Sequence, residues 1–468
     1  MTTAVATRMT TFTKLVARTN PVLPQRLAQS ATARSGAGPS GPALTGWLGQ
    51  RGHAHTFQVD RIPFAELSGW SFDDATGNLG HHSGRFFTVE GLHVAVHDPA
   101  STVLRAWQQP IIVQPEVGIL GILAKDIGGV LHLLMQAKME PGNPNMLQLS
   151  PTVQATHSNY TRVHDGVAVR YLDYFLTPGR GTVITDVLQS EHGSWFLRKV
   201  NRNMIVEVHE DVPPHEDFCW LTVGQIGELL RRDNVVNMDT RTVLACAPAT
   251  YVESAALHSD TELLSWFATE RSRHSLATVR IPLAEVDGWH RDTWTVKRPD
   301  ERYFKVVAVS VRSDSREVTQ WAQPLFEPSR RGIAAFVMRR FGGVPHLLVN
   351  ARVEGGFLDT VELGPTVQCT PEYHDPPPPF LDLVRGARPD RIRYAAVQSE
   401  EGGRFLNAEN HYLIVDADEH EAPLRPPPHY FWVTPGQLSS LLRHGHYVNM
   451  QARSLLAVVN ARAADLST

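Results

Sequence analysis

Two short polar patterns occur twice in this chain, and both contain side chains that could bind a polar ligand or move protons. In a strand, Gln136, Lys138 and Glu140 would all project from one face, because successive side chains alternate. A cation beside a carboxylate on such a face can anchor a ligand or transfer a proton. An ion pair on a solvated face would give the same pattern, so both interpretations stay open. The second copy keeps amide, cation and carboxylate as Asn350, Arg352 and Glu354.

The second pattern is a Thr-Val-Gln-X-Thr word that follows the first pattern in both copies. Alternation would present Thr152, Gln154 and Thr156 on one face of a strand. Hydroxyl and amide groups are neutral donors and acceptors, as recognition of a sugar or a base edge requires. The ordinary β-propensity of a Thr-rich strand is the alternative. The equivalent residues downstream are Thr366, Gln368 and Thr370.

Only the first copy continues into a segment rich in titratable side chains. His157, Tyr160 and His164 could transfer protons there, and Asn159 and Arg162 could bind a ligand. The second copy continues instead into a proline-rich loop at 376–379. A histidine that simply lies at the surface is the commoner outcome at each such position.

A basic cluster is likewise confined to the first copy. We expect a strand over 196–208 in which Arg198 and Arg202 lie on one side, where two guanidinium groups could clamp a diphosphate. Lys199 and Asn203 adjoin them, and a solvated charged face is the alternative. In the second copy these basic positions hold Asn407, Ala408 and His411. The asymmetry favours the first copy as the one that binds phosphate.

These patterns belong to an internal duplication that covers most of the chain. The words around Ala137 and Leu149 return 214 residues later, and Gln189-Ser190-Glu191 returns as Gln398-Ser399-Glu400. A period this long exceeds that of a solenoid and is about the size of a domain. We therefore expect a mobile N-terminal extension over 1–54, a catalytic first repeat over 55–250, and a related second repeat over 251–468 that binds ligand or supports the first.

The elements that must position these residues are strands with a few helices. Residues 118–124 form an apolar run, turn-forming residues 126–129 follow, and 130–140 would return antiparallel. Thr222 and Thr434 each open a T-x-x-Q capping box ahead of an amphipathic helix. Strands mixed with such helices predict the α+β class for each of two tandem homologous domains.

The composition is that of a folded globular protein, with a net charge of −4 and 20% charged residues. It gives no electrostatic reason to expect nucleic acid or an anionic membrane as partner. No apolar run approaches the roughly 20 residues that span a bilayer, and the three scattered cysteines fit a reducing cytoplasm. The region 1–54 lacks acidic residues, as a transit peptide does, but a mobile extension is the simpler interpretation.

Familiar signatures of catalysis are absent from the sequence. We find no GxGxxG motif after a strand, no Walker loop, no HExxH motif and no Cys/His spacing typical of a metal site. His209 and His215 lie in an acidic segment and are weak candidates for contacting a metal.

Several long words closely resemble the NDP-hexose 2,3-dehydratases, enzymes of deoxysugar pathways for bacterial antibiotics. They are QQPIIVQPEVGIL at 108–120, QAKMEPGN at 136–143, LSPTVQATHSNYT at 149–161 and NRNM at 201–204. The resemblance implies a lyase that removes water across C2 and C3 of dTDP-4-keto-6-deoxy-D-glucose and yields a dTDP-3,4-diketo-2,6-dideoxyhexose. It also implies a bacterial, cytoplasmic homodimer, a downstream 3-ketoreductase that takes the diketo product, and repeats similar to Nudix hydrolases, although the chain has no Nudix box.

The implied chemistry needs no cofactor and no metal, because the C4 ketone already acidifies the C3 proton. A base removes that proton, a donor stabilises the enolate at O4, and an acid protonates the leaving C2 hydroxyl. We expect Glu140 and Lys138 to take part, with Tyr160 or His164 as a further acid; which group is base and which is acid stays open. A non-catalytic nucleotide-sugar-binding module and a Nudix-like pyrophosphohydrolase are the alternatives.

The full set of expected contacts follows from these patterns. Candidate substrate-binding residues are Gln136, Thr152, Gln154, Thr156, Asn159, Arg162, Gln189, Glu191, Arg198, Lys199, Arg202 and Asn203. A second pocket would use Asn350, Arg352, Glu354, Thr366, Gln368 and Thr370.

Overall fold

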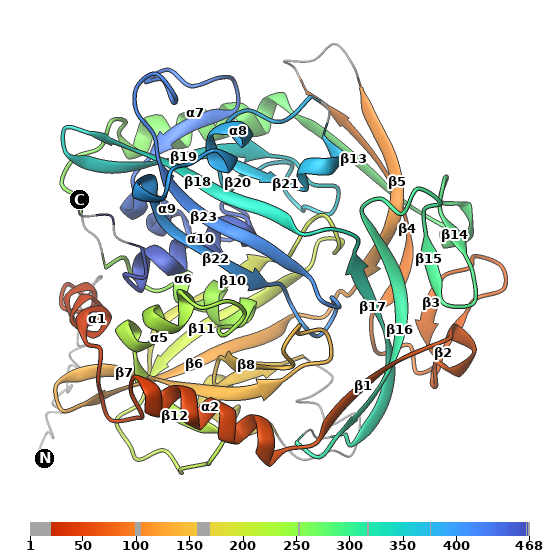
Figure 1. Cartoon of the computed structure of the whole chain (residues 1–468), viewed down its shortest axis with the longest axis horizontal. Helices are drawn as coiled ribbons and strands as arrows, with labels where there is room; N and C mark the ends of the chain where they lie inside the picture. Colours follow the sequence, from red (N-terminus) through yellow and green to blue (C-terminus); the bar gives the residue numbers. More distant parts are fainter. Residues whose placement is uncertain are drawn as a thin grey trace, which may run out of the picture.

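The chain folds into a mixed α/β structure of two repeated halves, dominated by sheets (Figure 1). The structure is a computed structural model, and it describes residues 20–98, 104–156, 169–250, 253–315, 318–374, 376–464 and 466. The α+β class predicted from the sequence is confirmed at this coarse level. We refer to the halves before and after residue 251 as the first and second repeat.

Each repeat contains a seven-stranded sheet, and the two sheets have the same strand order. The first is built from β6 (Gly118–Ile127), β7 (Val130–Met139), β8 (Leu147–Ser150), β9 (Val153–Ala155), β10 (Thr182–Ser190), β11 (Val200–Glu207) and β12 (Phe218–Thr222). The second is built from β18 (Gly332–Phe341), β19 (Val344–Arg352), β20 (Glu362–Gly364), β21 (Val367–Cys369), β22 (Ile392–Ser399), β23 (Glu409–Asp416) and β24 (Tyr430–Val433). The orders are β10-β11-β6-β7-β12 and β22-β23-β18-β19-β24. In the first sheet β8 also pairs with β7 and β9 with β6, and in the second sheet β20 pairs with β19 and β21 with β18.

The hairpin between β6 and β7 forms as its sequence predicts. Gly128 and Gly129 have φ angles of 63° and 82°, which glycine adopts without steric cost, and they turn the chain by the expected route. The two strands then pair antiparallel from Ile127 and Val130 outward. β11 completes the centre of the sheet by running parallel to β6.

Two further sheets exchange a strand between the repeats, which the sequence did not indicate. The first-repeat strands are β1 (Phe57–Ile62), β2 (Trp70–Phe72), β3 (Leu79–His81), β4 (Thr88–His97) and β5 (Arg105–Val113). The second-repeat strands are β13 (Ser275–Ile281), β14 (His290–Arg291), β15 (Thr295–Lys297), β16 (Phe304–Ser313) and β17 (Gln320–Pro328). β1 pairs antiparallel with β16, and β13 pairs antiparallel with β4 (Figure 1). Because each repeat supplies an edge strand to the other, the two repeats interlock.

Helices α6 (Met238–Ala245) and α10 (Met450–Asn460) pack against each other between the repeats and carry equivalent buried arginines. Arg241 donates to the carbonyl of Ser399 at 2.6 Å, and Arg453 donates to the carbonyl of Ser190. Both guanidinium groups therefore find acceptors in the opposite repeat, as a buried charge requires. The adjacent Gln189 donates across the interface to the carbonyl of Leu442 at 3.0 Å. The repeated Gln-Ser-Glu words thus help to join the two repeats.

Two further helices directly follow the edge strands β12 and β24. α5 (Val223–Leu230) and α9 (Pro435–Leu441) begin at the predicted capping boxes of Thr222 and Thr434. Shorter elements are α4 (Asp173–Leu176), α8 (Leu381–Arg385) and the 3-10 turns η1 (Phe64–Glu66), η2 (Leu283–Glu285), η3 (Pro371–Tyr373) and η4 (Pro389–Arg391). No helix among the described residues is long and apolar enough to cross a bilayer.

The segment before the first sheet is helical and packed, so the expected mobile extension does not hold for its described part. It forms α1 (Leu23–Thr32) and α2 (Pro42–Ala54), the latter equivalent to α7 (Asp260–Arg273) of the second repeat. Leu23, Leu27 and Ala31 are buried in the main core, and the Ser30 hydroxyl donates to the carbonyl of Leu131 at 2.6 Å. An apolar stripe at helical spacing binds α1 to β7 despite a composition typical of a leader.

Two loops cross between the repeats at glycines that leave no room for a side chain. A Cβ on Gly142 would lie 1.7 Å from the carbonyl oxygen of Phe405. The Gly142 N–H donates to the carbonyl of Gly402 at 2.8 Å, and the Asn407 N–H donates back to the carbonyl of Gly142 at 2.8 Å. This close approach brings residues 401–404 of the second repeat against the sheet of the first.

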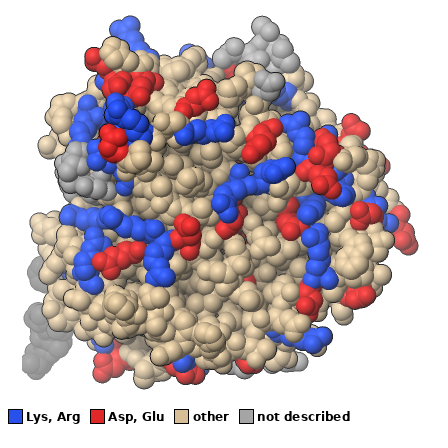
Figure 2. All heavy atoms as spheres, viewed as in Figure 1, with Lys and Arg blue, Asp and Glu red and all other residues tan. Residues whose placement is uncertain are grey.

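The outer surface carries basic and acidic side chains close to one another. Figure 2 shows them interspersed on the face drawn rather than gathered into a field of one sign. Exposed pairs of this kind, such as Arg388 with Asp390 at 3.2 Å, each contribute little to stability.

Candidate functional site

A cavity of about 730 Å³ opens over the sheet of the first repeat and is closed by segments of both repeats. Its floor contains residues of β6, β7, β9 and β11. The second repeat contributes the start of β17, from Gln320 to Gln323, and the crossing loop at Glu401, Gly403 and Arg404. The volume suits a ligand of the size of a nucleotide sugar or a drug-like molecule.

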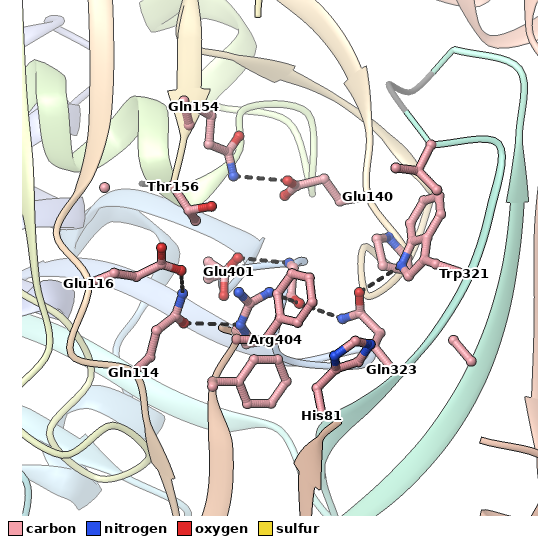
Figure 3. Close-up of a pocket in the computed structure, with 18 of the residues that line it drawn as sticks. His81, Gln114, Glu116, Glu140, Gln154, Thr156, Trp321, Gln323, Glu401 and Arg404 are labelled. Carbon is pink, nitrogen blue, oxygen red and sulfur yellow. Dashed lines mark hydrogen bonds between the residues drawn. The ribbon is translucent and has the colours of Figure 1, made fainter. Parts of the chain in front are cut away.

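Lys138, Glu140 and Gln154 form one hydrogen-bonded group in this cavity. The Lys138 ammonium donates to Gln154 Oε1 at 2.9 Å and lies 3.3 Å from Glu140 Oε1. The Gln154 amide in turn donates to Glu140 Oε1 at 2.9 Å, as Figure 3 shows. β11 pairs with one edge of β6, and β7 and β9 pair with successive stretches of its other edge, which brings the two sequence patterns together.

Glu140 belongs to a group of carboxylates that line the cavity, which we call the acid cluster: Glu140, Glu191 and Asp239, which are buried, and Glu401, which is partly buried. Burial raises the pKa of Glu191, and burial together with the neighbouring Glu401 raises the pKa of Asp239 well above its ordinary value. Burial and the nearby charges of Glu140 and Glu191 raise the pKa of Glu401 to about 7, against the opposing effect of Arg404. A carboxyl group with a pKa of about 7, as Glu401 has, still carries a proton in part of the molecules at neutral pH, which general acid catalysis requires.

Two of these carboxylates keep an oxygen available. Glu191 Oε1 accepts from the Asn201 amide at 2.7 Å, and Glu401 Oε1 accepts from the Gly403 N–H at 2.9 Å. Among the residues that the structure describes, the second oxygen of each is buried without a hydrogen-bond partner. A buried oxygen without a partner favours the protonated form of its own carboxyl group, or the binding of a ligand hydroxyl group that donates to it.

Two cations lie beside the acid cluster. The Lys199 ammonium donates to the carbonyl of Glu116, and burial lowers its pKa to about 8. The Arg404 guanidinium donates to Gln114 Oε1 at 3.1 Å and lies 4.4 Å from the centre of the Phe87 ring. Gln114 also donates to Glu116 at 2.8 Å. Arg404 therefore links the acid cluster to the aromatic part of the cavity (Figure 3).

The opposite part of the cavity is an aromatic wall, formed by Trp70, His81, Phe86, Phe87 and Trp321. His81 packs 5.4 Å from Trp70 and 4.6 Å from Phe86, measured between ring centres. The Trp321 indole donates to Gln323 Oε1 at 2.8 Å, and the Gln323 amide donates to the carbonyl of Gly403 at 2.7 Å. Flat ring faces beside fixed amide groups are suited to holding a planar base.

Of the twelve first-repeat candidates that the structure describes, six lie together at the cavity. Those that line the cavity are Lys138, Glu140, Gln154, Thr156, Glu191 and Lys199. Thr152 instead accepts from the Leu123 N–H at 2.9 Å and donates to the carbonyl of Leu134, so its hydroxyl holds β6, β7 and β9 together. Gln189 serves the interface between repeats, Gln136 is partly buried on β7, and Asn203 is buried on β11. Asn159, Tyr160, Arg162 and His164 lie outside the described residues, as does His157.

The expected arginine clamp does not form. Arg198 is exposed and has a φ angle of 50°, because a turn precedes β11 and the strand begins only at Val200. Arg202 is paired with Asp186 of the neighbouring strand, with contacts of 2.7 and 2.5 Å, and does not line the cavity. The prediction failed because it extended the strand alternation through a residue in a left-handed turn.

The sequence patterns missed several residues of the cavity. Asp239, Glu401 and Arg404 fell outside the patterns, as did the aromatic wall. Both acids follow words repeated in the two copies, and each differs from its counterpart: Asp239 stands where the second repeat has Gln451, and Glu401 stands where the first has His192. That mismatch beside a repeated word was the available signal.

The equivalent constellation in the second repeat is satisfied by its own side chains. Arg352 contacts Glu354 at 2.8 Å and donates to the carbonyl of Gln368 at 3.0 Å. Gln368 donates to Glu354 at 2.9 Å and accepts from Asn449 at 2.8 Å. Thr366 repeats the structural bonds of Thr152, and Asn350 and Thr370 are partly buried.

Charged groups of the cavity are replaced around this second constellation. The counterparts of Lys199, Asp239 and Arg404 are Ala408, Gln451 and Trp195. His192, the counterpart of Glu401, lies 2.9 Å from Glu400 in a buried ion pair, and Trp195 packs 4.4 Å from the Phe405 ring. The two constellations share a backbone plan and differ in charge.

Two comparisons with known proteins bear on the family of this chain. The sequence profile of a family described as NDP-hexose 2,3-dehydratase matches residues 42–247 and again 260–459. Three relatives carry the name dTDP-4-dehydro-6-deoxy-α-D-glucopyranose 2,3-dehydratase. That of Amycolatopsis orientalis is 57% identical and covers 94% of each chain. That of Saccharopolyspora spinosa is 52% identical over 89% of this chain and 90% of its own, and that of Streptomyces violaceoruber is 51% identical over 88% and 95%. The chain therefore belongs to the NDP-hexose 2,3-dehydratase family.

Proposed function

We propose that the cavity of the first repeat is the active site of a dTDP-4-keto-6-deoxy-D-glucose 2,3-dehydratase. The enzyme is a lyase that eliminates water across C2 and C3 of the hexose and gives a dTDP-3,4-diketo-2,6-dideoxyhexose, a step of deoxysugar biosynthesis. The observation that carries this assignment is the combination, in one cavity, of the acid cluster beside Lys138 and an aromatic wall linked to it by Arg404.

The lining suggests one orientation of the substrate. The thymine base would stack on the aromatic wall, where Gln323 and Trp321 fix polar groups. The diphosphate would lie at Arg404, whose planar guanidinium group can bind two phosphate oxygens, with Lys199 nearby. The hexose would then reach the acid cluster, where Gln154 and Thr156 offer neutral contacts for its hydroxyl groups.

Glu140 is the base in this proposal, because its carboxylate lies 3.3 Å from the Lys138 ammonium, so that the base and a donor for the enolate adjoin each other. It takes the proton from C3, and the electron pair moves into an enolate at C3–C4 with charge on O4. Lys138 donates to that oxygen as the charge develops. The assignment follows from the contacts of Glu140 and Lys138 with Gln154.

Glu401 is the acid in this proposal. Its raised pKa of about 7 keeps a proton available near neutral pH, and its free oxygen is buried in the cavity. It protonates the C2 hydroxyl as the C2–O bond breaks and water leaves. The enol at C2–C3 then takes a proton at C2, loses one from its hydroxyl group and becomes the 3,4-diketone.

The second repeat supports this site in our proposal. It supplies Glu401, Arg404 and Gln323 to the cavity, whereas Arg352 and Glu354 of its own constellation pair with each other. Finer features of the family resemblance are part of the proposal as well: a Nudix-like fold for each repeat, a homodimer in the cytoplasm, and a 3-ketoreductase that consumes the diketone.

Product analysis tests the function directly. Purified chain is incubated with dTDP-4-keto-6-deoxyglucose, an NADPH-dependent 3-ketoreductase and NADPH, and the sugar is analysed by mass spectrometry. A 2,6-dideoxy sugar is expected. Tight binding without turnover would indicate a nucleotide-sugar-binding module, and Mg²⁺-dependent release of dTMP would indicate a pyrophosphohydrolase; either result contradicts the proposal.

A further inference from the structure

Asp98, His274 and His429 converge at a junction of the two repeats that has no part in the cavity. Asp98 follows β4, His274 joins α7 to β13, and His429 precedes β24. Their ligand atoms all lie within 4.8 Å of one another. The Nε2 atoms of His274 and His429 lie 3.7 and 3.4 Å from Asp98 Oδ1.

Both imidazole rings are oriented by Glu270. Nδ1 of His274 lies 2.8 Å from the backbone carbonyl oxygen of Glu270, and Nδ1 of His429 lies 2.8 Å from its carboxylate. Both partners are acceptors, so each Nδ1 carries the hydrogen and each Nε2 can present a lone pair toward Asp98. Metal-binding histidines in proteins are usually held in this way, with the outer nitrogen donating to a carboxylate or a carbonyl.

The surroundings of His429 support a ligand at this point. Its Nε2 atom is buried and has no hydrogen-bond partner among the described residues, and the His274 side chain is only 4% exposed. His429 also has a φ angle of 69°, a left-handed conformation that costs a non-glycine residue free energy. A buried, unpartnered nitrogen on a strained backbone is more common where the position serves a bound group.

We propose that Asp98, His274 and His429 bind one zinc ion, with a water molecule in the fourth position. Nitrogen and carboxylate ligands at about 2.0–2.2 Å from tetrahedral zinc lie about 3.3–3.5 Å apart. The three ligand atoms lie within 4.8 Å of one another, so side-chain shifts of about an ångström would complete the site. Asp98 belongs to the first repeat and the histidines to the second, so the ion joins the repeats where β13 pairs with β4. The site is structural and is independent of the dehydration.

The duplication places an equivalent junction elsewhere between the repeats, and its residues differ in a way that serves as a comparison. It contains His55, Asp217 and Asp314, but Arg51 stands in place of Glu270 and lies 3.7 Å from Asp217. His55 Nε2 lies 3.0 Å from Asp217 and its Nδ1 lies 3.4 Å from Asp314. Both ring nitrogens thus face carboxylates, and a cation already neutralises the group, so this junction is an ion-pair network. His55→Gln is therefore a matched control.

Metal titration of the untagged full chain tests the proposal. After treatment with a chelator, the protein should bind one equivalent of Zn²⁺ at pH 7.5 and gain melting temperature. One equivalent of Co²⁺ should give the visible absorption of a tetrahedral site. His429→Gln should weaken Zn²⁺ binding at least about 10-fold, since even outer-shell changes have that effect, whereas His55→Gln should bind as the wild type does.

The alternative is a junction that binds no metal and is held by hydrogen bonds between its protonated side chains. Absence of a one-equivalent binding phase in the wild type, or equal Zn²⁺ affinity in the wild type and His429→Gln, would overturn the proposal. Should His429→Gln fail to fold by circular dichroism, Asp98→Asn decides in its place: retention of wild-type affinity overturns the proposal, and weakened binding supports it.

Discussion

Glu401 of the second repeat lies close enough to Glu140 of the first for its pKa to be raised by that carboxylate. The two residues are far apart in the sequence and reach one cavity because the loop at Gly402 crosses onto Gly142. A base and an acid for one elimination reaction can thus come from different copies of the duplicated unit. The close contact at Gly142 is what holds them in place.

The proton on Glu401 predicts a pH dependence. With a pKa of about 7, the carboxyl group is protonated below neutrality and loses its proton as the pH rises. The turnover number should therefore fall as pH increases above about 7. Glu401→Gln should lower turnover by about 10²–10³-fold, within the range for general acids, and should lose this limb of the profile. An unchanged limb in the variant would assign it to another group.

Arg404 and Arg202 make opposite predictions for nucleotide binding. Arg404→Ala removes a guanidinium group from the cavity and should weaken binding of dTDP by about 10-fold or more, since a charge-assisted hydrogen bond is lost. Arg202→Ala removes an ion pair with Asp186 outside the cavity and should leave dTDP affinity unchanged. Isothermal titration calorimetry measures both. If Arg202→Ala weakened dTDP binding and Arg404→Ala did not, the result would contradict this assignment and support phosphate binding by Arg202.

The buried pair of His192 and Glu400 should make stability depend on pH. Burial lowers the pKa of His192, but Glu400 and the other nearby carboxylates outweigh it and raise that pKa above 6.5. This stabilisation is therefore present below 6.5 and is lost as pH rises through the folded-state pKa. Burial raises the pKa of Glu400, but His192 and the other partners outweigh it and lower that pKa below 4.5. The contribution of Glu400 is therefore present above 4.5 and is lost as pH falls through the folded-state pKa. The two windows overlap between 4.5 and 6.5.

Urea unfolding of the wild type and of His192→Gln at several pH values measures this effect. The variant should be less stable by about 3–5 kcal/mol where the pair is charged, because removal of one partner leaves a buried charge. The difference between the two proteins should be largest near pH 5–6 and should shrink in alkaline solution. A difference independent of pH would indicate that the pair is not ionised.

Local patterns of the sequence predicted the local structure well. The hairpin at Gly128–Gly129, the capping boxes at Thr222 and Thr434, and the shared side of Lys138 and Glu140 all follow from turn chemistry and side-chain alternation. The duplication predicted two sheets of one plan. Each of these features depends on residues close together in one copy.

Features that depend on contacts between the two copies could not be predicted from such local patterns. The exchange of β1 and β13 is a choice of partner between two similar edges, and periodicity within one copy does not specify it. Glu401 and Arg404 enter the cavity only through the crossing loop, so no spacing in the first repeat points to them. The prediction that Arg198 and Arg202 share a strand face was wrong because a single left-handed residue changes the face that its neighbours occupy.

The paired variants Glu140→Gln and Glu354→Gln test the central assignment most directly, because each removes the equivalent carboxylate from one repeat. The measurement is the rate of formation of the 2,6-dideoxy sugar in the assay coupled to a 3-ketoreductase. We expect Glu140→Gln to lower the rate by about 10²–10⁴-fold, as loss of a general base does, and Glu354→Gln to retain near wild-type turnover. Near-full activity in Glu140→Gln, or loss of activity only in Glu354→Gln, would contradict the account.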